Sequence, residues 1–254
     1  MSTRLETLQV AKLAPRMLGE SAELVADFFR SQIAADGGFR GRGDASDSDL
    51  YYTIFGLDGL HALGGEQPDG VAGFLRRFGD GSSVPDLVHL GSLMRSWAAL
   101  DDVEPEPSHR DAWIERLAGF RQDDGGWSAE PDGDRGSVYG TFIAVGAYQD
   151  AGVPIPDVDA AIAYLDARAM PDGGYAPDAE LAVSTMPTTA AAVDALRQLG
   201  ATPNPEAADW LRRLRHPGGG FLAADGAPMP DLLSTAIALH TLSALGADLD
   251  DLAD

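Results

Sequence analysis

The chain has 254 residues, of which 44% are hydrophobic, with a formal net charge of −22 and no cysteine. The lack of cysteine excludes disulfide bonds, thiolate nucleophiles and cysteine-ligated metal sites. The acidic balance argues against binding to nucleic acid, because neutralising phosphates needs a basic face. Residues 1–20 lack the unbroken apolar core of a signal peptide and no run is long enough to span a bilayer, so a cytoplasmic location is expected.

Two kinds of helix are predicted, an amphipathic outer set and an inner set that is apolar nearly all round. In chain order we expect outer 23–33, inner from 50, outer 70–78, inner from 87, outer 108–121, inner from 137, outer 158–169, inner from 185, outer 206–215 and inner from 232. The inner helices are predicted to end at C-cap glycines, namely Gly64, Gly152, Gly200 and Gly246. No stretch alternates with the period of a strand, so the chain is predicted to be all-α.

One phrase of glycines followed by an aromatic residue recurs between these helices. Its copies are residues 36–39, 124–127, 172–175 and 218–221. The aromatic residues lie 88, 48 and 46 residues apart, so the first gap is nearly two periods and places a degenerate copy near 78–81. Such a period is typical of repeat proteins, in which no unit can bury its apolar face alone.

Each phrase is predicted to be a turn. Its glycines take positive φ, its Asp side chain bonds its own backbone, and its aromatic residue fills the gap between successive helices. The whole chain, 1–254, is predicted to be one domain of helical-hairpin repeats. Their approximate bounds are 21–65, 66–101, 107–152, 157–200 and 205–246, followed by an acidic tail at 247–254.

Turns of this kind, followed by an apolar helix that carries Tyr and Thr, resemble those of the prenyltransferase β-subunit and squalene/terpene cyclase repeat superfamily. The likeness covers residues 21–246. Its closest part is 47–53, Asp-Ser-Asp-Leu-Tyr-Tyr-Thr, which is similar to the first repeat of Rab geranylgeranyltransferase β-subunits and of short bacterial proteins related to them. The resemblance implies an α/α toroid, while activity depends on the few positions where a chain departs from its repeats.

The resemblance also implies a central cavity that holds an isoprenoid chain between aromatic side chains of the inner helices. The candidate wall residues are Tyr51, Tyr52, Phe55, Trp97, Tyr139 and Phe142, about half of which are expected to build core instead. The family binds the diphosphate with cations at the starts of inner helices, for which the candidates are Arg40, Arg42, Arg135 and His89. The alternative is that these arginines are surface residues paired with Asp44, Asp47, Asp132 or Asp134.

Asp49 and His89 are the catalytic candidates, with Asp49 assisting the acceptor. Catalytic members of the family hold zinc with Asp, Cys and His, and this chain departs from that pattern. In one register Tyr51 stands in place of the cysteine and His89 matches the histidine; in the other the histidine position falls on Ser234. The registers conflict, so no metal ligand is assigned, and zinc or magnesium stays open as a cofactor.

Three functions stay open. The first is a prenyltransferase-like protein that binds an isoprenoid diphosphate, with or without transfer of the prenyl group. The second is a non-catalytic homodimeric ring that binds an isoprenoid, another hydrophobic small molecule or a peptide. The third is a class II terpene cyclase-like enzyme, whose Asp-x-Asp-Asp motif the chain matches at 248–251, in a tail where solvent would ionise the carboxyls. Five inner helices are fewer than in complete relatives, so segment 5–13 or a second subunit would complete the ring.

Overall fold

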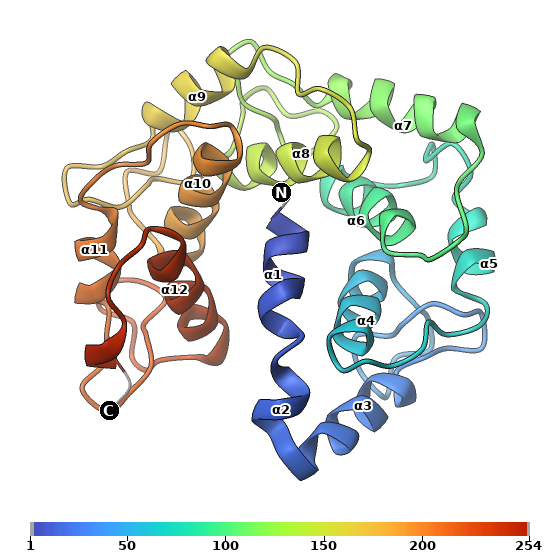
Figure 1. Cartoon of the computed structure of the whole chain (residues 1–254). Coiled ribbons are helices and arrows are strands. Elements are labelled where there is room, and N and C mark those ends of the chain that lie inside the picture. The colour runs from blue at the N-terminus through green and yellow to red at the C-terminus, as the bar shows by residue number, and fades with distance from the viewer. Residues whose placement is uncertain (1–2, 253–254) are drawn as a thin grey trace. The chain divides into compact units, whose positions relative to one another are not determined.

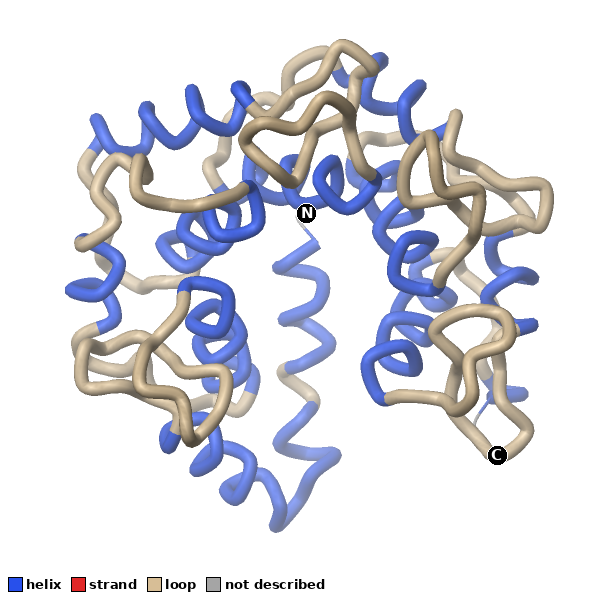
Figure 2. The backbone as a smooth tube through the Cα atoms, turned by 180° about the vertical axis from the view of Figure 1, so that it is seen from behind, coloured by secondary structure: helices blue, strands red, loops and turns tan. Residues whose placement is uncertain are grey.

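The computed structural model describes residues 3–252, and within that range it is built of helices and loops without a strand (Figure 2). The inner helices are α4 (Leu50–Ala62), α6 (Leu87–Ala98), α8 (Val138–Asp150), α10 (Met186–Gln198) and α12 (Leu232–Ala244). The outer helices are α3 (Ala22–Ser31), α5 (Val71–Arg76), α7 (Pro107–Gly119), α9 (Val158–Asp166) and α11 (Ala207–Arg213). The all-α prediction and the alternation of inner and outer helices are therefore confirmed.

Short elements lie at the two ends of the described range. Segment 5–13 falls largely in α1 (Thr3–Ala11), which is followed by α2 (Ala14–Leu18) and the 3₁₀ turn η1 (Gly19–Ser21). The tail contains the 3₁₀ turn η2 (Asp250–Leu252), and its last two positions, 253–254, lie outside the described residues. Across 3–252, no helix is long and apolar enough to cross a membrane.

The chain forms two compact units. The first contains residues 1–120 and 146–154, and the second contains 121–145 and 155–254. In the first unit α4 packs against α6, α1 and α3 pack against α4, and α5 and α7 pack against α6 (Figure 1). In the second unit α10 packs against α12, with α9 against α10 and α11 against both (Figure 1). A single domain over 1–254 stays a prediction.

The Gly-Gly-aromatic turns share one hydrogen-bond pattern. The aromatic residues, Phe39, Trp127, Tyr175 and Phe221, are at most 3% exposed. The backbone N–H of each donates to the Oγ1 of the threonine 14 residues later, over 2.9–3.1 Å; these are Thr53, Thr141, Thr189 and Thr235. The turn is thus tied to the first turn of the inner helix that follows, which explains why the spacing of aromatic and threonine is kept.

The predicted turn conformation is also confirmed. Asp36, Asp124 and Asp172 each accept a hydrogen bond from the backbone N–H two residues on. In the last copy Gly218 stands at the aspartate position, and its own N–H donates to Nδ1 of His216. The first glycine of the turn, Gly37 or Gly125, has φ of 91°, a left-handed conformation that residues with a Cβ rarely adopt. A Cβ on Gly37 would also lie 2.4 Å from the carbonyl oxygen of Gly70. The degenerate copy at 78–81 is held differently: the Trp113 indole N–H of α7 donates to the Gly79 carbonyl over 2.9 Å.

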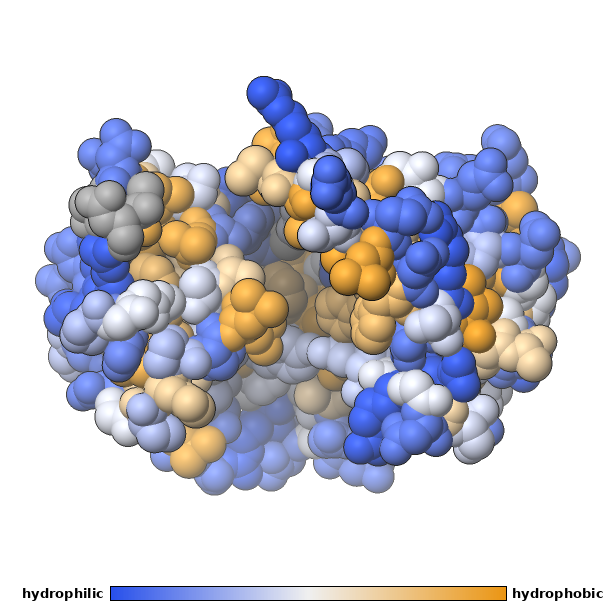
Figure 3. Space-filling view, turned by 90° about the horizontal axis from the view of Figure 1, so that it is seen from below, coloured by the Kyte–Doolittle hydropathy of each residue, from blue (hydrophilic) through white to orange (hydrophobic). Residues whose placement is uncertain are grey.

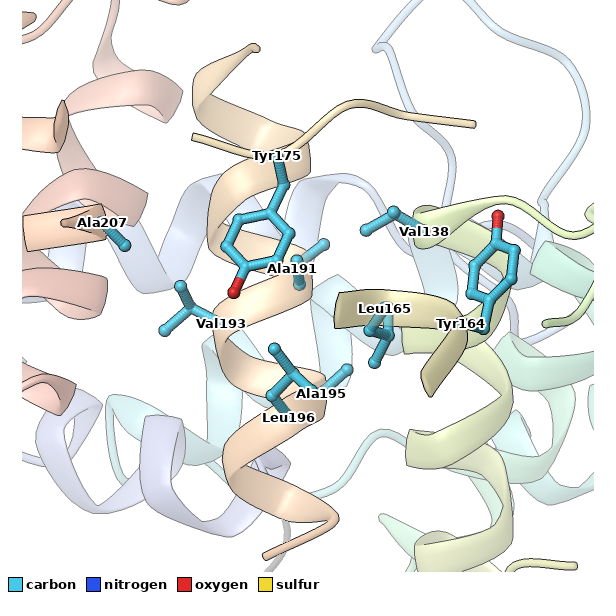
Figure 4. Packing of buried hydrophobic residues seen from close by; sticks show 10 residues of the cluster. Val138, Tyr164, Leu165, Tyr175, Ala191, Val193, Ala195, Leu196 and Ala207 are labelled. Carbon is cyan, nitrogen blue, oxygen red and sulfur yellow. The ribbon is translucent and has the colours of Figure 1, made fainter. Parts of the chain in front are cut away.

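Figure 4 shows the core of the second unit around the Tyr175 ring. Its buried residues are Val138, Tyr164, Leu165, Tyr175, Ala191, Ala192, Val193, Ala195, Leu196 and Ala207. They come from α8, α9, α10, α11 and the turn, so the aromatic residue joins successive repeats as predicted. The Tyr175 hydroxyl accepts the backbone N–H of Asn204 over 2.8 Å, which satisfies its buried oxygen.

The turn-to-helix hydrogen bond is expected to matter for stability. Thr141 Oγ1 accepts from the buried N–H of Trp127 and donates to the carbonyl of Ser137. Thr141→Val keeps the shape but leaves that N–H unpaired, so it should lower the free energy of unfolding by about 1–3 kcal/mol. Urea denaturation measures the effect. Thr202→Val, in an exposed loop, is the matched control, and an equal loss in both variants would contradict this role.

Candidate functional site

The starts of α4 and α6 bring three polar side chains together in the first unit. Asp49 caps α4, where its Oδ1 accepts the N–H groups of Tyr51 and Tyr52 over 2.7 and 3.3 Å. Asp86 caps α6 by accepting the His89 N–H over 2.9 Å. The N–H of Asp49 itself donates to the Phe39 carbonyl, so the repeat turn positions the capping carboxylate.

His89 lies between the two capping carboxylates. Its Nδ1 is 2.8 Å from Asp86 Oδ1 and its Nε2 is 3.4 Å from Asp49 Oδ2. The carboxylate at Nδ1 fixes the orientation of the ring, so that Nε2 faces Asp49. All three side chains are 24–37% exposed, so solvent and ligands reach them. A histidine held in this way can accept or deliver a proton at Nε2.

The two residues predicted to be catalytic are therefore in contact, and Asp86 is an additional member. The sequence signal for Asp86 was the Asp-x-x-His spacing, which places a cap and a side chain three residues later on the same helix end.

These residues do not fit the zinc site that the family resemblance implies. Zinc sites of this kind need a third protein ligand, and Tyr51 stands at the cysteine position. Throughout residues 3–252, no group of three His, Asp or Glu side chains is placed to hold a metal ion. In the alternative register, Ser234 bonds Asp231 through both its N–H and its hydroxyl at the start of α12, so Ser234 belongs to a helix cap.

Three aromatic side chains form an accessible cluster on α4. The Tyr51 ring lies 5.5 Å from Tyr52 and 4.9 Å from Phe55, both edge to face. Tyr52 is 45% and Phe55 54% exposed. Helix α4 is apolar nearly all round, as predicted, and it exposes part of this apolar surface. Other apolar residues are also exposed among hydrophilic ones (Figure 3).

The α4 cluster adjoins the loop that carries two of the predicted arginines. A Cβ on Gly41 would lie 2.3 Å from the Tyr52 ring, so the ring packs directly on the backbone between Arg40 and Arg42. The Arg42 side chain is 82% exposed, and its ion pair with Asp44 is long at 3.9 Å. Arg40 is half-buried and donates to the carbonyl of Ser31 at the end of α3. Arg42 is thus available to a ligand, whereas Arg40 supports the loop.

The remaining aromatic candidates divide between surface and core. On α8, Tyr139 is 44% exposed and lies 6.3 Å from Phe142, which packs against the core around Tyr175. Trp97 is only 5% exposed and stacks on Trp113 with ring centroids 6.5 Å apart. Trp97 therefore belongs to the core between α6 and α7, because Trp113 of α7 covers its ring.

Arg135, in the second unit, is held by its own surroundings. It bonds Asp134 over 2.9 Å and forms a second ion pair with Glu180. The hydrogen bond from Arg135 lowers the pKa of Asp134, and the hydrogen bonds to Asp134 and Glu180 raise the pKa of Arg135. This is the surface pairing given above as the alternative for the arginines.

The cyclase-like motif lies in the solvated tail. Asp248 and Asp250 are exposed, and Asp248 accepts the N–H of Asp250 over 3.0 Å. A proton donor for an alkene must be buried and hydrogen-bonded in its acid form, and these exposed carboxyls lack that burial. The exposure agrees with the expectation that residues 248–251 lie in a solvated tail.

The chain belongs to the prenyltransferase alpha-alpha toroid domain family, whose model matches residues 13–79, 92–186 and 188–254. This match confirms the expected superfamily and fold class. No curated protein is significantly similar to the chain in sequence.

Solved structures share this fold at low sequence identity. One is Candida albicans protein geranylgeranyltransferase-I complexed with GGPP, 15% identical, with a TM-score of 0.69 over 92% of this chain and 79% of that one. A second is a variant of the type II terpene cyclase MstE from Scytonema with its product merosterolic acid A, 17% identical, with a TM-score of 0.62 over 89% and 82%. A third is an MstE variant with its substrate geranylgeranyl dihydroxybenzoate, 17% identical, with a TM-score of 0.61 over 85% and 68%.

Proposed function

We propose that the chain binds an isoprenoid diphosphate, with the apolar tail on the α4 aromatic cluster and the diphosphate at Arg42. The observation that carries this proposal is the packing of Tyr52 on Gly41, which sets an exposed aromatic surface beside an exposed guanidinium. Such a surface suits an amphiphile that has an anionic head and an apolar tail. The family membership supports it, as do the isoprenoid ligands named for the similar structures.

The polar group at the helix starts suggests what could follow binding. Asp49 is next to Tyr51 and Tyr52 in the chain, so a ligand on the aromatic cluster lies close to the Asp49–His89 pair. In a transfer reaction this pair would take the proton that an acceptor group loses, with Asp86 holding the histidine ring in place.

Binding without turnover is the second candidate. The observation that favours it is that, in the register that matches His89 to the family's histidine, Tyr51 stands where the resemblance places a cysteine ligand. A phenol in place of the thiolate does not favour the zinc that would activate a thiol acceptor. Both candidates require the same isoprenoid surface, so a binding measurement comes first.

Arg42→Ala is expected to weaken binding of farnesyl diphosphate by about 1.5–3 kcal/mol, the scale of a charge-assisted hydrogen bond. Stability should not change, since the side chain is 82% exposed. Isothermal titration calorimetry measures the affinity. Farnesol, which lacks the diphosphate, should bind both proteins equally. Arg135→Ala is the matched control, because that guanidinium is already paired; equal effects of both substitutions would contradict the assignment of the head group.

A further inference from the structure

The aromatic face of α4 ends at a charged pair. Tyr51, Phe55 and Asp58 are spaced i, i+4 and i+7, so their side chains share one face of the helix. Arg4 of α1 forms an ion pair with Asp58, with an N···O distance of 3.1 Å. Arg4 also donates to the Ala98 carbonyl at the end of α6 over 3.4 Å. Helix α1 therefore meets α4 one turn beyond Phe55, at the side away from the Asp49 cap.

This pair is shielded from solvent. The Arg4 side chain is 10% exposed and that of Asp58 is 26% exposed. Burial raises the pKa of Asp58, and the charge of Arg4 opposes this rise. Leu8, one helical turn after Arg4, is 6% exposed, so this face of α1 is packed and holds the guanidinium in place. A second ion pair, Arg95 with Asp150 at 2.8 Å, lies close enough for its charges to act on the pKa of Asp58, which Arg95 lowers and Asp150 raises.

An apolar ligand cannot extend past such a group without cost. A tail on the cluster has about 10 Å of helix between Tyr51 and Asp58, from the rise of 1.5 Å per residue. A longer tail would have to lie against the desolvated ion pair or displace it. Contact with the pair gives the tail no apolar partner, and displacement leaves buried charges unpaired. Arg4 also lines a small pocket whose other lining residues include both apolar Leu57 and polar Glu66.

We propose that the Arg4–Asp58 pair limits the length of the isoprenoid tail that the α4 face accepts, and so makes the chain selective for shorter isoprenoid diphosphates. This inference rests on the proposed function, since it concerns the same surface. Affinity should rise from geranyl to farnesyl diphosphate, because each added methylene is buried. It should then stop rising at geranylgeranyl diphosphate: with the first unit beside the head group at Arg42 and the next two along the stretch from Tyr51 to Asp58, the fourth unit meets the charged pair.

The test is the ratio of the dissociation constants of farnesyl and geranylgeranyl diphosphate, measured by calorimetry on the full chain. In the double variant Arg4→Leu/Asp58→Leu the face continues as apolar surface, and replacing a buried pair on both sides is commonly tolerated. The ratio should shift about tenfold toward geranylgeranyl diphosphate, the scale of one to two further buried methylenes. Affinity for geranyl diphosphate should stay as in the wild type.

Two further variants make the result decisive. Asp27→Leu/Arg30→Leu makes the same chemical change at an exposed ion pair of α3, and it should leave the ratio unaltered. If the first double variant does not fold, Arg4→Met/Asp58→Asn removes both charges with less change of shape and should shift the ratio in the same direction. Binding with an unaltered ratio would overturn the length limit alone. Failure of the wild type to bind any of the three diphosphates would overturn the proposed function, and this inference with it.

Discussion

Trp127→Ala is expected to lower the free energy of unfolding by about 3–5 kcal/mol, the cost of removing a large aromatic side chain from a packed core. The Trp127 ring is completely buried, and the Arg121 guanidinium lies over it, 4.8 Å from its centroid. Because the residue joins its turn to α8, neighbouring side chains cannot close the cavity without moving the turn. Denaturation in urea measures the loss.

Phe28→Ala is the control for this prediction. Phe28 is an aromatic residue of α3 that is 59% exposed, and its truncation should cost less than about 1 kcal/mol. Comparable losses in the two variants would show that the repeat aromatics do not have the wedge role assigned to them.

Arg95→Ala is expected to cost about 3–5 kcal/mol, because it leaves a buried carboxylate without its partner. The Asp150 side chain is 4% exposed, and its Oδ2 accepts from Arg95 Nε over 2.8 Å. The pair links α6 to the end of α8 within the first unit. In Arg95→Ala/Asp150→Asn the uncompensated charge is gone, so much of the stability should return.

An exposed ion pair provides the comparison. Arg30 contacts Glu23 and Asp27 on α3 with its side chain 45% exposed, so Arg30→Ala should be far less destabilising than Arg95→Ala. If Arg95→Ala/Asp150→Asn were no more stable than Arg95→Ala, the unpaired buried charge would not be the cause of the loss.

Local rules predicted the helices and turns from the sequence. Gly37 and Gly125 were identified as turn residues because positive φ is strained for any residue with a Cβ. The aromatic residues after them were predicted to be buried because their spacing repeats, and Tyr175 in its core shows why. These features depend on residues close together in the chain, so one sequence contains the information for them.

The site was less predictable, because its outcome depends on contacts distant in sequence. The pairing of Arg135 with Glu180 joins two loops, and the burial of Trp97 depends on Trp113 in the next helix. Asp49 and His89 were selected from motifs of the family, and no periodicity predicted that they would meet. The contact of Arg4 with Asp58 was missed because no motif or spacing in residues 3–11 indicates that Arg4 packs against α4.

The central claim is that the α4 surface binds an isoprenoid diphosphate, and a calorimetric titration of the wild-type chain and Tyr52→Ala with geranyl and farnesyl diphosphate tests it most directly. We expect both ligands to bind the wild type, and Tyr52→Ala to weaken farnesyl diphosphate more than geranyl diphosphate, since each methylene that loses its apolar contact forfeits up to about 0.8 kcal/mol. No binding to the wild type, or affinities that are indifferent to the loss of Tyr52, would contradict the isoprenoid assignment and favour a peptide-binding or purely structural role.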